Sequence, residues 1–125
     1  MQSKGEQMKV GVVAACLMLS VVQARADSMI WHIQNNTTHH LQVQFDSQTR
    51  AYFWPTQNTA WNLNKKKLGT YSIACNAGEY ICYAAWSSPG NKVSWGKGST
   101  GKNACTNCCY TCGPNPNTQV VTLHD

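Results

Sequence analysis

Six cysteines carry most of the reactive chemistry of this chain: Cys75, Cys82, Cys105, Cys108, Cys109 and Cys112. The last four follow the spacing C-x-x-C-C-x-x-C, and C-x-x-C is a ligand spacing of zinc sites. In a short exported chain, an even number of cysteines indicates a disulfide framework instead. The choice between metal and disulfide chemistry therefore depends on the compartment in which the protein folds.

The N-terminal residues have the layout of a secretory signal peptide. Basic residues precede an apolar run over residues 10–22, and Ala24 and Ala26 fit the A-x-A pattern of a cleavage site. We predict a signal peptide over residues 1–26, cut between Ala26 and Asp27, and a periplasmic or secreted protein. The apolar run is shorter than the roughly 20 residues of a transmembrane helix, so no membrane span is expected after cleavage.

Cys16 offers a rival interpretation of this segment. Small residues precede it, as they do at a bacterial lipoprotein site, which would place a lipid on Cys16. The apolar run continues beyond the cysteine, however, where a lipoprotein is already polar. Simple cleavage is therefore the favoured interpretation.

Export favours disulfides at all six remaining cysteines, because oxidising compartments convert thiols to disulfides. Six cysteines allow 15 pairings, and the sequence does not choose among them. Cys108 and Cys109 are not expected to pair with each other, because a bond between neighbours strains the peptide. We favour bonds from Cys75 and Cys82 into the C-terminal cluster, which would pin residues 87–117 to the sheet. A zinc or copper site built from Cys105 to Cys112 stays open as the alternative.

Other motifs in the chain do not indicate chemistry. Residues 96–103 come close to a phosphate-binding loop, but Asn103 replaces the hydroxyl residue and no helix is expected to follow. The pair His39-His40 has no third ligand nearby in sequence and is interpreted as the edge of a turn. We therefore expect neither a nucleotide nor a resident cofactor or metal.

Catalysis and nucleic-acid binding are not expected from the charged residues. After cleavage four carboxylates remain, and no nucleophile elbow or metalloprotease motif accompanies them. Seven Lys and Arg residues remain as well, so the net charge is +3, and Lys65-Lys66-Lys67 is the one run. Nucleic-acid binding requires a denser basic stripe, and a short like-charge run is typical of a solvated turn.

Alternating apolar and polar residues predict β-structure after residue 27. Residues 41–46 alternate strictly, which is typical of a half-buried strand, and residues 30–34 are the expected hairpin partner. Residues 70–75 and 80–86 flank a four-residue turn and predict a second hairpin. The remaining expected strands are 51–54, 61–63, 92–95 and 118–123. We predict one all-β domain over residues 27–125, a small antiparallel sandwich or barrel of about seven short strands cross-linked by disulfides.

The functional prediction follows from the aromatic residues. Twelve aromatic side chains lie in the predicted domain, and four tryptophans stand at expected strand ends: Trp54, Trp61, Trp86 and Trp95. Exposed rings bind sugars and fill protein pockets, whereas buried rings dominate small cores. We predict a non-catalytic binding module for a glycan or protein of the cell envelope or exterior. A metal-binding envelope protein and a small secreted toxin or inhibitor are the alternatives.

Overall fold

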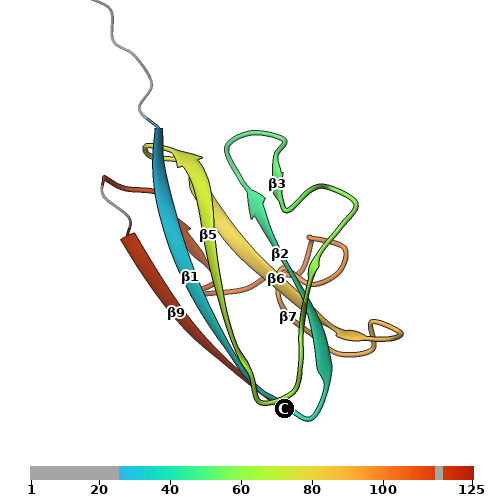
Figure 1. Ribbon diagram of the computed structural model, residues 1–125. Helices are drawn as coiled ribbons and strands as arrows, with labels where there is room; N and C mark the ends of the chain where they lie inside the picture. Colours follow the sequence, from blue (N-terminus) through green and yellow to red (C-terminus); the bar gives the residue numbers. More distant parts are fainter. Residues whose placement is uncertain (1–25, 115–116) are drawn as a thin grey trace, which may run out of the picture.

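The computed structural model describes residues 26–114 and 117–125, which form two β-sheets packed as a sandwich (Figure 1). Apart from Ala26, the predicted signal peptide lies outside the described residues. Within them we find no helix, and the strands are β1 (Ala26–Asn36), β2 (His40–Ser47), β3 (Phe53–Trp54), β4 (Trp61–Leu63), β5 (Leu68–Asn76), β6 (Tyr80–Ser88), β7 (Ser94–Gly96), β8 (Cys109–Thr111) and β9 (Asn117–His124). The all-β prediction is confirmed.

Strand β1 is the centre of the smaller sheet, whose order is β5-β1-β9. Strand β5 runs antiparallel to β1, whereas β9 runs parallel to it. In the larger sheet, β2 pairs with β6 along its whole length and with β3 and β4 on its other edge. Strands β7 and β8 pair with the far edge of β6. The parallel β1–β9 pair is the exception to the predicted antiparallel arrangement.

The core lies between the two sheets, as the alternation in the sequence predicts. Along β2, Leu41, Val43 and Phe45 are buried, while the intervening residues are partly exposed. Trp31 of β1 is fully buried and packs against Phe45 with their ring centroids 4.9 Å apart. Tyr71 of β5 approaches Phe45 at 5.5 Å. Large rings thus fill much of this small core, which is how a short chain buries enough apolar surface.

The two predicted hairpins do not form. Strands β1 and β2 belong to different sheets, and so do β5 and β6. Each connection carries the chain from one sheet to the other, so the apolar faces of the connected strands meet across the core instead of lying side by side. The alternation of apolar and polar residues is the same for a hairpin and for a crossing between the sheets. The contacts of the turns decide which of the two forms.

Asn35 fixes the first crossing between the sheets. Its side chain is fully buried, and Nδ2 donates to the carbonyl oxygens of His39 at 2.9 Å, Leu63 at 3.2 Å and Asn64 at 3.1 Å. Its Oδ1 accepts hydrogen bonds from the Thr37 backbone N–H at 3.0 Å and hydroxyl at 2.7 Å. One amide therefore holds the β1–β2 turn against the β4–β5 turn.

Glu79 fixes the second crossing. Its buried carboxylate accepts hydrogen bonds from the Ser47 hydroxyl at 2.6 Å, the Asn76 backbone N–H at 2.9 Å and Arg50 Nη2 at 3.1 Å. Burial alone would raise the pKa of Glu79, but the hydrogen bonds from Arg50, Asn76 and Ser47 outweigh burial and lower it. This ion pair ties the β5–β6 turn to the end of β2.

Three disulfides cross-link the described chain: Cys75–Cys112, Cys82–Cys109 and Cys105–Cys108. The first joins β5 of the smaller sheet to the residue that follows β8. The second fastens β8 to β6, and the third closes a turn just before β8. The two cysteines that flank the β5–β6 turn thus bond into the C-terminal cluster, which is the arrangement that the sequence favoured.

We predict that Asn35→Ala lowers the free energy of unfolding by about 3 kcal/mol, because one buried and two partly buried carbonyl oxygens lose their donor. The measurement is urea unfolding followed by tryptophan fluorescence. The control is Asn36→Ala, at the exposed neighbouring position, which should change the free energy by less than about 0.5 kcal/mol. Equal effects of the two substitutions would contradict the role assigned to Asn35.

The lowered pKa of Glu79 predicts acid-sensitive stability. The unfolded chain protonates this carboxylate at a higher pH than the folded chain, so stability falls as the pH drops below about 4.5. Glu79→Gln should be less stable at neutral pH and should lose part of this acid dependence in unfolding measured across pH.

Asp46→Asn is the matched control, because burial raises the pKa of Asp46 and disfavours its charge. This variant should keep or gain stability at neutral pH. An unchanged acid dependence in Glu79→Gln would contradict the assignment of that dependence to Glu79.

Candidate functional site

A groove of about 400 Å³ opens on the outer face of the larger sheet, over β2 and β6. This volume is within the roughly 300 to 1,000 Å³ of typical ligand sites. The β3–β4 loop, residues 55–60, contributes to one side, and the β7–β8 loop, residues 97–108, contributes to the other. The lining residues are Gln42, Gln44, Gln57, Asn58, Thr59, Ala60, Trp86 and Ser99.

Two adjacent strands supply the floor of the groove. The alternation that buries Val43 turns Gln42 and Gln44 to the outer face, and Gln42 lies opposite Trp86 of β6. The Trp86 indole N–H donates to Gln42 Oε1 at 3.1 Å, and Gln42 Nε2 donates to Asn62 Oδ1 at 3.3 Å. These hydrogen bonds fix the orientation of the Gln42 amide and of the indole ring.

Gln44 holds the β3–β4 loop at the edge of the groove. Its Nε2 lies within hydrogen-bond distance of three carbonyl oxygens, of Thr56 at 2.8 Å, Gln57 at 3.3 Å and Thr59 at 3.1 Å. The hydroxyls of Thr56 and Thr59 are 2.7 Å apart and bond to each other. The loop is thus held in one conformation, with the exposed Asn58 at its tip.

The β7–β8 loop turns tightly before it reaches the groove. Gly96 and Gly98 adopt φ values of 62° and 73°, and a Cβ on Gly96 would overlap the Tyr83 carbonyl oxygen. Asn103 Nδ2 donates to Ser94 Oγ at 3.1 Å and closes the turn. The residues that resemble a phosphate-binding loop therefore form a compact turn that brings Ser99 to the groove.

The lining of the groove is polar and uncharged. Amide and hydroxyl side chains surround the indole of Trp86, and no acid–base group is among the eight described residues that line the groove. Asp46, the next outward residue along β2, does not line it. Such a surface recognises a neutral polar ligand by hydrogen bonds, since amides offer both donors and acceptors.

A second hollow of about 250 Å³ lies beside β3 and shares Gln57 with the groove. Tyr52 lines it and is 46% exposed. The guanidinium carbon of Arg50 lies 4.3 Å from the centre of the Tyr52 ring, within the range of a cation–π contact. An exposed aromatic ring thus stands next to the polar groove.

The four tryptophans singled out by the sequence lie in different places. Trp86 lines the groove with the small part of its surface, 8%, that is exposed. Trp54 is buried and donates from Nε1 to the Ala74 carbonyl oxygen at 3.0 Å, and Trp61 packs against Tyr71 in the core with ring centroids 4.9 Å apart. Trp95 is partly buried at one end of the sandwich. The structure therefore brings only Trp86 to the groove.

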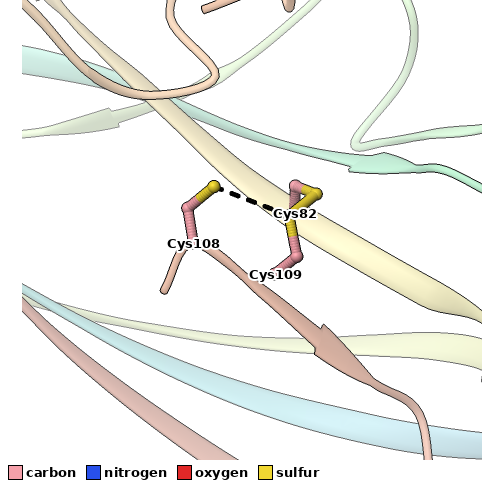
Figure 2. Close-up of side chains that lie close together, drawn as sticks. All are labelled: Cys82, Cys108 and Cys109. Atoms are coloured by element: carbon pink, nitrogen blue, oxygen red, sulfur yellow. Dashed lines mark hydrogen bonds between the residues drawn. A yellow bond between two sulfur atoms is a disulfide. The ribbon is translucent and has the colours of Figure 1, made fainter. Parts of the chain in front are cut away.

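The cysteine cluster provides the alternative metal site. Among the described residues, the sulfur atoms of Cys82, Cys108 and Cys109 lie within 4.8 Å of one another (Figure 2), and no histidine joins this group. The Sγ atoms of Cys108 and Cys109 are 3.5 Å apart. All three sulfurs belong to disulfides, Cys82–Cys109 and Cys105–Cys108, and a disulfide sulfur is not the thiolate that binds zinc. The arrangement could hold a metal only after reduction.

The chain matches no protein-family model, no curated protein and no solved structure. Among the residues that the structure describes, no helix has the length and apolar character needed to cross a membrane.

The sequence singled out Trp86, which lies on the floor of the groove, and the segment after it, which supplies Ser99. Gln42 and Gln44 stood out only as polar positions of an alternating strand, and Asn58 was not singled out. The sequence does place two glutamines, Gln42 and Gln44, on the outer face of a half-buried strand. They indicate a binding surface only once the strand register, which puts Gln42 opposite Trp86, is known.

We predict that the intact protein, recovered from an oxidising compartment, has a mass lower by six hydrogens than its fully reduced chain. Native mass spectrometry should find no bound zinc or copper, and a chelator should leave the melting temperature unchanged. Free thiols together with one equivalent of metal would instead favour the metal-binding alternative.

Proposed function

We propose that this protein is an exported, non-catalytic binding module, and that the groove on the outer face of the larger sheet binds a neutral oligosaccharide. The observation that carries this proposal is the lining of the groove, in which amides and hydroxyls surround one indole ring. Sugar hydroxyls require paired donors and acceptors, and a sugar ring also presents an apolar C–H face to an aromatic side chain.

The rigidity of the groove supports this function. The Gln44 amide, within hydrogen-bond distance of three loop carbonyl oxygens, holds one side, while disulfides fix the C-terminal end of the segment that contains Ser99. A site that is ordered before binding loses less conformational entropy when the ligand arrives. The shared Gln57 also allows a longer ligand to reach Tyr52 in the second hollow.

Export is supported by the three disulfides, which form and persist in oxidising compartments. The predicted signal peptide also favours export to such a compartment. Binding is favoured over catalysis because an uncharged lining offers no group for proton transfer. We accordingly assign the protein to the periplasm or the exterior, with a glycan of that environment as its partner.

The test is binding of neutral and acidic oligosaccharides, screened on an array and measured by titration calorimetry. We expect a neutral glycan to bind, and Gln57→Ala to weaken it about tenfold, the loss expected when one good hydrogen bond to a ligand is removed. Trp86→Phe should also weaken it, because the smaller ring offers less stacking surface and no longer orients the Gln42 amide. Both substitutions should leave the far-ultraviolet circular dichroism unchanged.

Gln48→Ala is the matched control, since Gln48 is an exposed glutamine that does not line the groove. It should bind the glycan as the wild type does. A bound glycan whose affinity is insensitive to Gln57→Ala and Trp86→Phe would contradict the placement of the site in this groove.

A further inference from the structure

Several turns meet at the end of the sandwich where the chain reaches its C-terminal residue (Figure 1). The β1–β2 turn and the β4–β5 turn are joined there by Asn35, and Thr38 donates its backbone N–H to Asp125 Oδ2 at 3.1 Å. The β6–β7 loop lies at the same end, because Ser88 pairs with His40 and Val93 bonds to Ser87. We call this surface, formed by residues 36–40, 64–68, 89–93 and 124–125, the basic end.

Positive charge is concentrated at the basic end. It carries four of the seven Lys and Arg residues that follow residue 26: Lys65, Lys66, Lys67 and Lys92. All four are exposed. The one carboxylate side chain here, Asp125, is engaged by the Thr38 backbone N–H and by His39, whose Nε2 is 3.7 Å from Asp125 Oδ1.

The other acidic residues of the described chain lie toward the opposite end of the strands. Asp27 stands opposite Cys75 near the β5–β6 turn, Asp46 stands opposite Cys82, and Glu79 is within that turn. Arg50 pairs with Glu79 at that opposite end, whereas the four lysines of the basic end face one carboxylate side chain, so this end has an excess of positive charge and a positive field toward solvent.

Exposed apolar side chains accompany the lysines. Leu68 directly follows the lysine run and is 55% exposed, and Val93 directly follows Lys92 and is 38% exposed. Trp95 lies beside this end, where its indole N–H donates to the His124 carbonyl oxygen at 2.8 Å. A soluble polyanion would gain from the lysines alone, whereas a bilayer interface also accommodates aliphatic and indole side chains.

We propose that the basic end docks on the surface of a bilayer that contains anionic phospholipids. The lysines attract the negative surface, and Leu68 and Val93 enter the headgroup region. This contact is independent of the groove, which opens on the outer face of the larger sheet. Each lysine close to such a surface strengthens binding roughly fivefold at moderate ionic strength.

The experiment is co-sedimentation of the exported form, of verified N-terminal residue, with vesicles of phosphatidylcholine with or without phosphatidylglycerol. We expect binding only with phosphatidylglycerol, and a loss of roughly fivefold for each lysine removed in Lys65→Gln/Lys67→Gln. The control Lys97→Gln/Lys102→Gln removes the same charge elsewhere and should bind as the wild type. Equal losses in the two double variants, or equal binding to both kinds of vesicle, would overturn the proposal.

Leu68→Ser/Val93→Ser separates a bilayer from a soluble polyanion. This variant should bind anionic vesicles more weakly but should bind dextran sulfate, used as the polyanion, no less than the wild type. Unchanged vesicle binding would overturn the bilayer in favour of a polyanion. The groove variant Gln57→Ala should keep full vesicle binding, so that failure of the glycan site and failure of the membrane contact are told apart.

Discussion

Two covalent bonds hold one short segment, residues 109–112, to strands from both sheets. Cys82–Cys109 attaches it to β6 of the larger sheet, and Cys75–Cys112 attaches it to β5 of the smaller one. By loop-closure entropy each bond contributes roughly 3 to 4 kcal/mol. Their further effect is to fix the far end of residues 89–108, which contain few apolar side chains and would not order by burial alone. The side of the groove that carries Ser99 therefore depends on these two bonds.

The sequence predicted the strands well and their partners poorly, and the reason is physical. Alternation shows which side of a strand is buried, but it is the same whether the next strand along the chain pairs with it in one sheet or lies across the core. The choice between a hairpin and a crossing to the other sheet depends on Asn35 and Glu79, which are residue types common in turns. Both are buried, and several of their hydrogen-bond partners are far away in sequence, Leu63 and Asn64 for Asn35 and Ser47 and Arg50 for Glu79. A local pattern contains no information about such distant partners.

The same limit applied to the groove. Trp86 and the cross-linked segment after it could be singled out because aromatic residues and cysteines are conspicuous by type. Gln42 and Gln44 are typical outward residues of a half-buried strand, and they line a groove only because two loops, residues 55–60 and 97–108, stand on either side of them. Trp54 lies in the core and Trp61 packs against it, which is the alternative role that the sequence left open for rings at strand ends.

The proposed glycan site and the proposed membrane contact rest on different forces, and the fold keeps them apart. The groove is lined by neutral side chains, so its contacts are short-range hydrogen bonds that salt hardly screens. The basic end acts through lysines whose attraction to an anionic surface weakens as ionic strength rises. Because the acidic residues lie toward the other end of the strands, they do not neutralise this field. A protein built in this way could rest on a charged surface while an uncharged ligand occupies its groove, and salt would release it from the surface without emptying the groove.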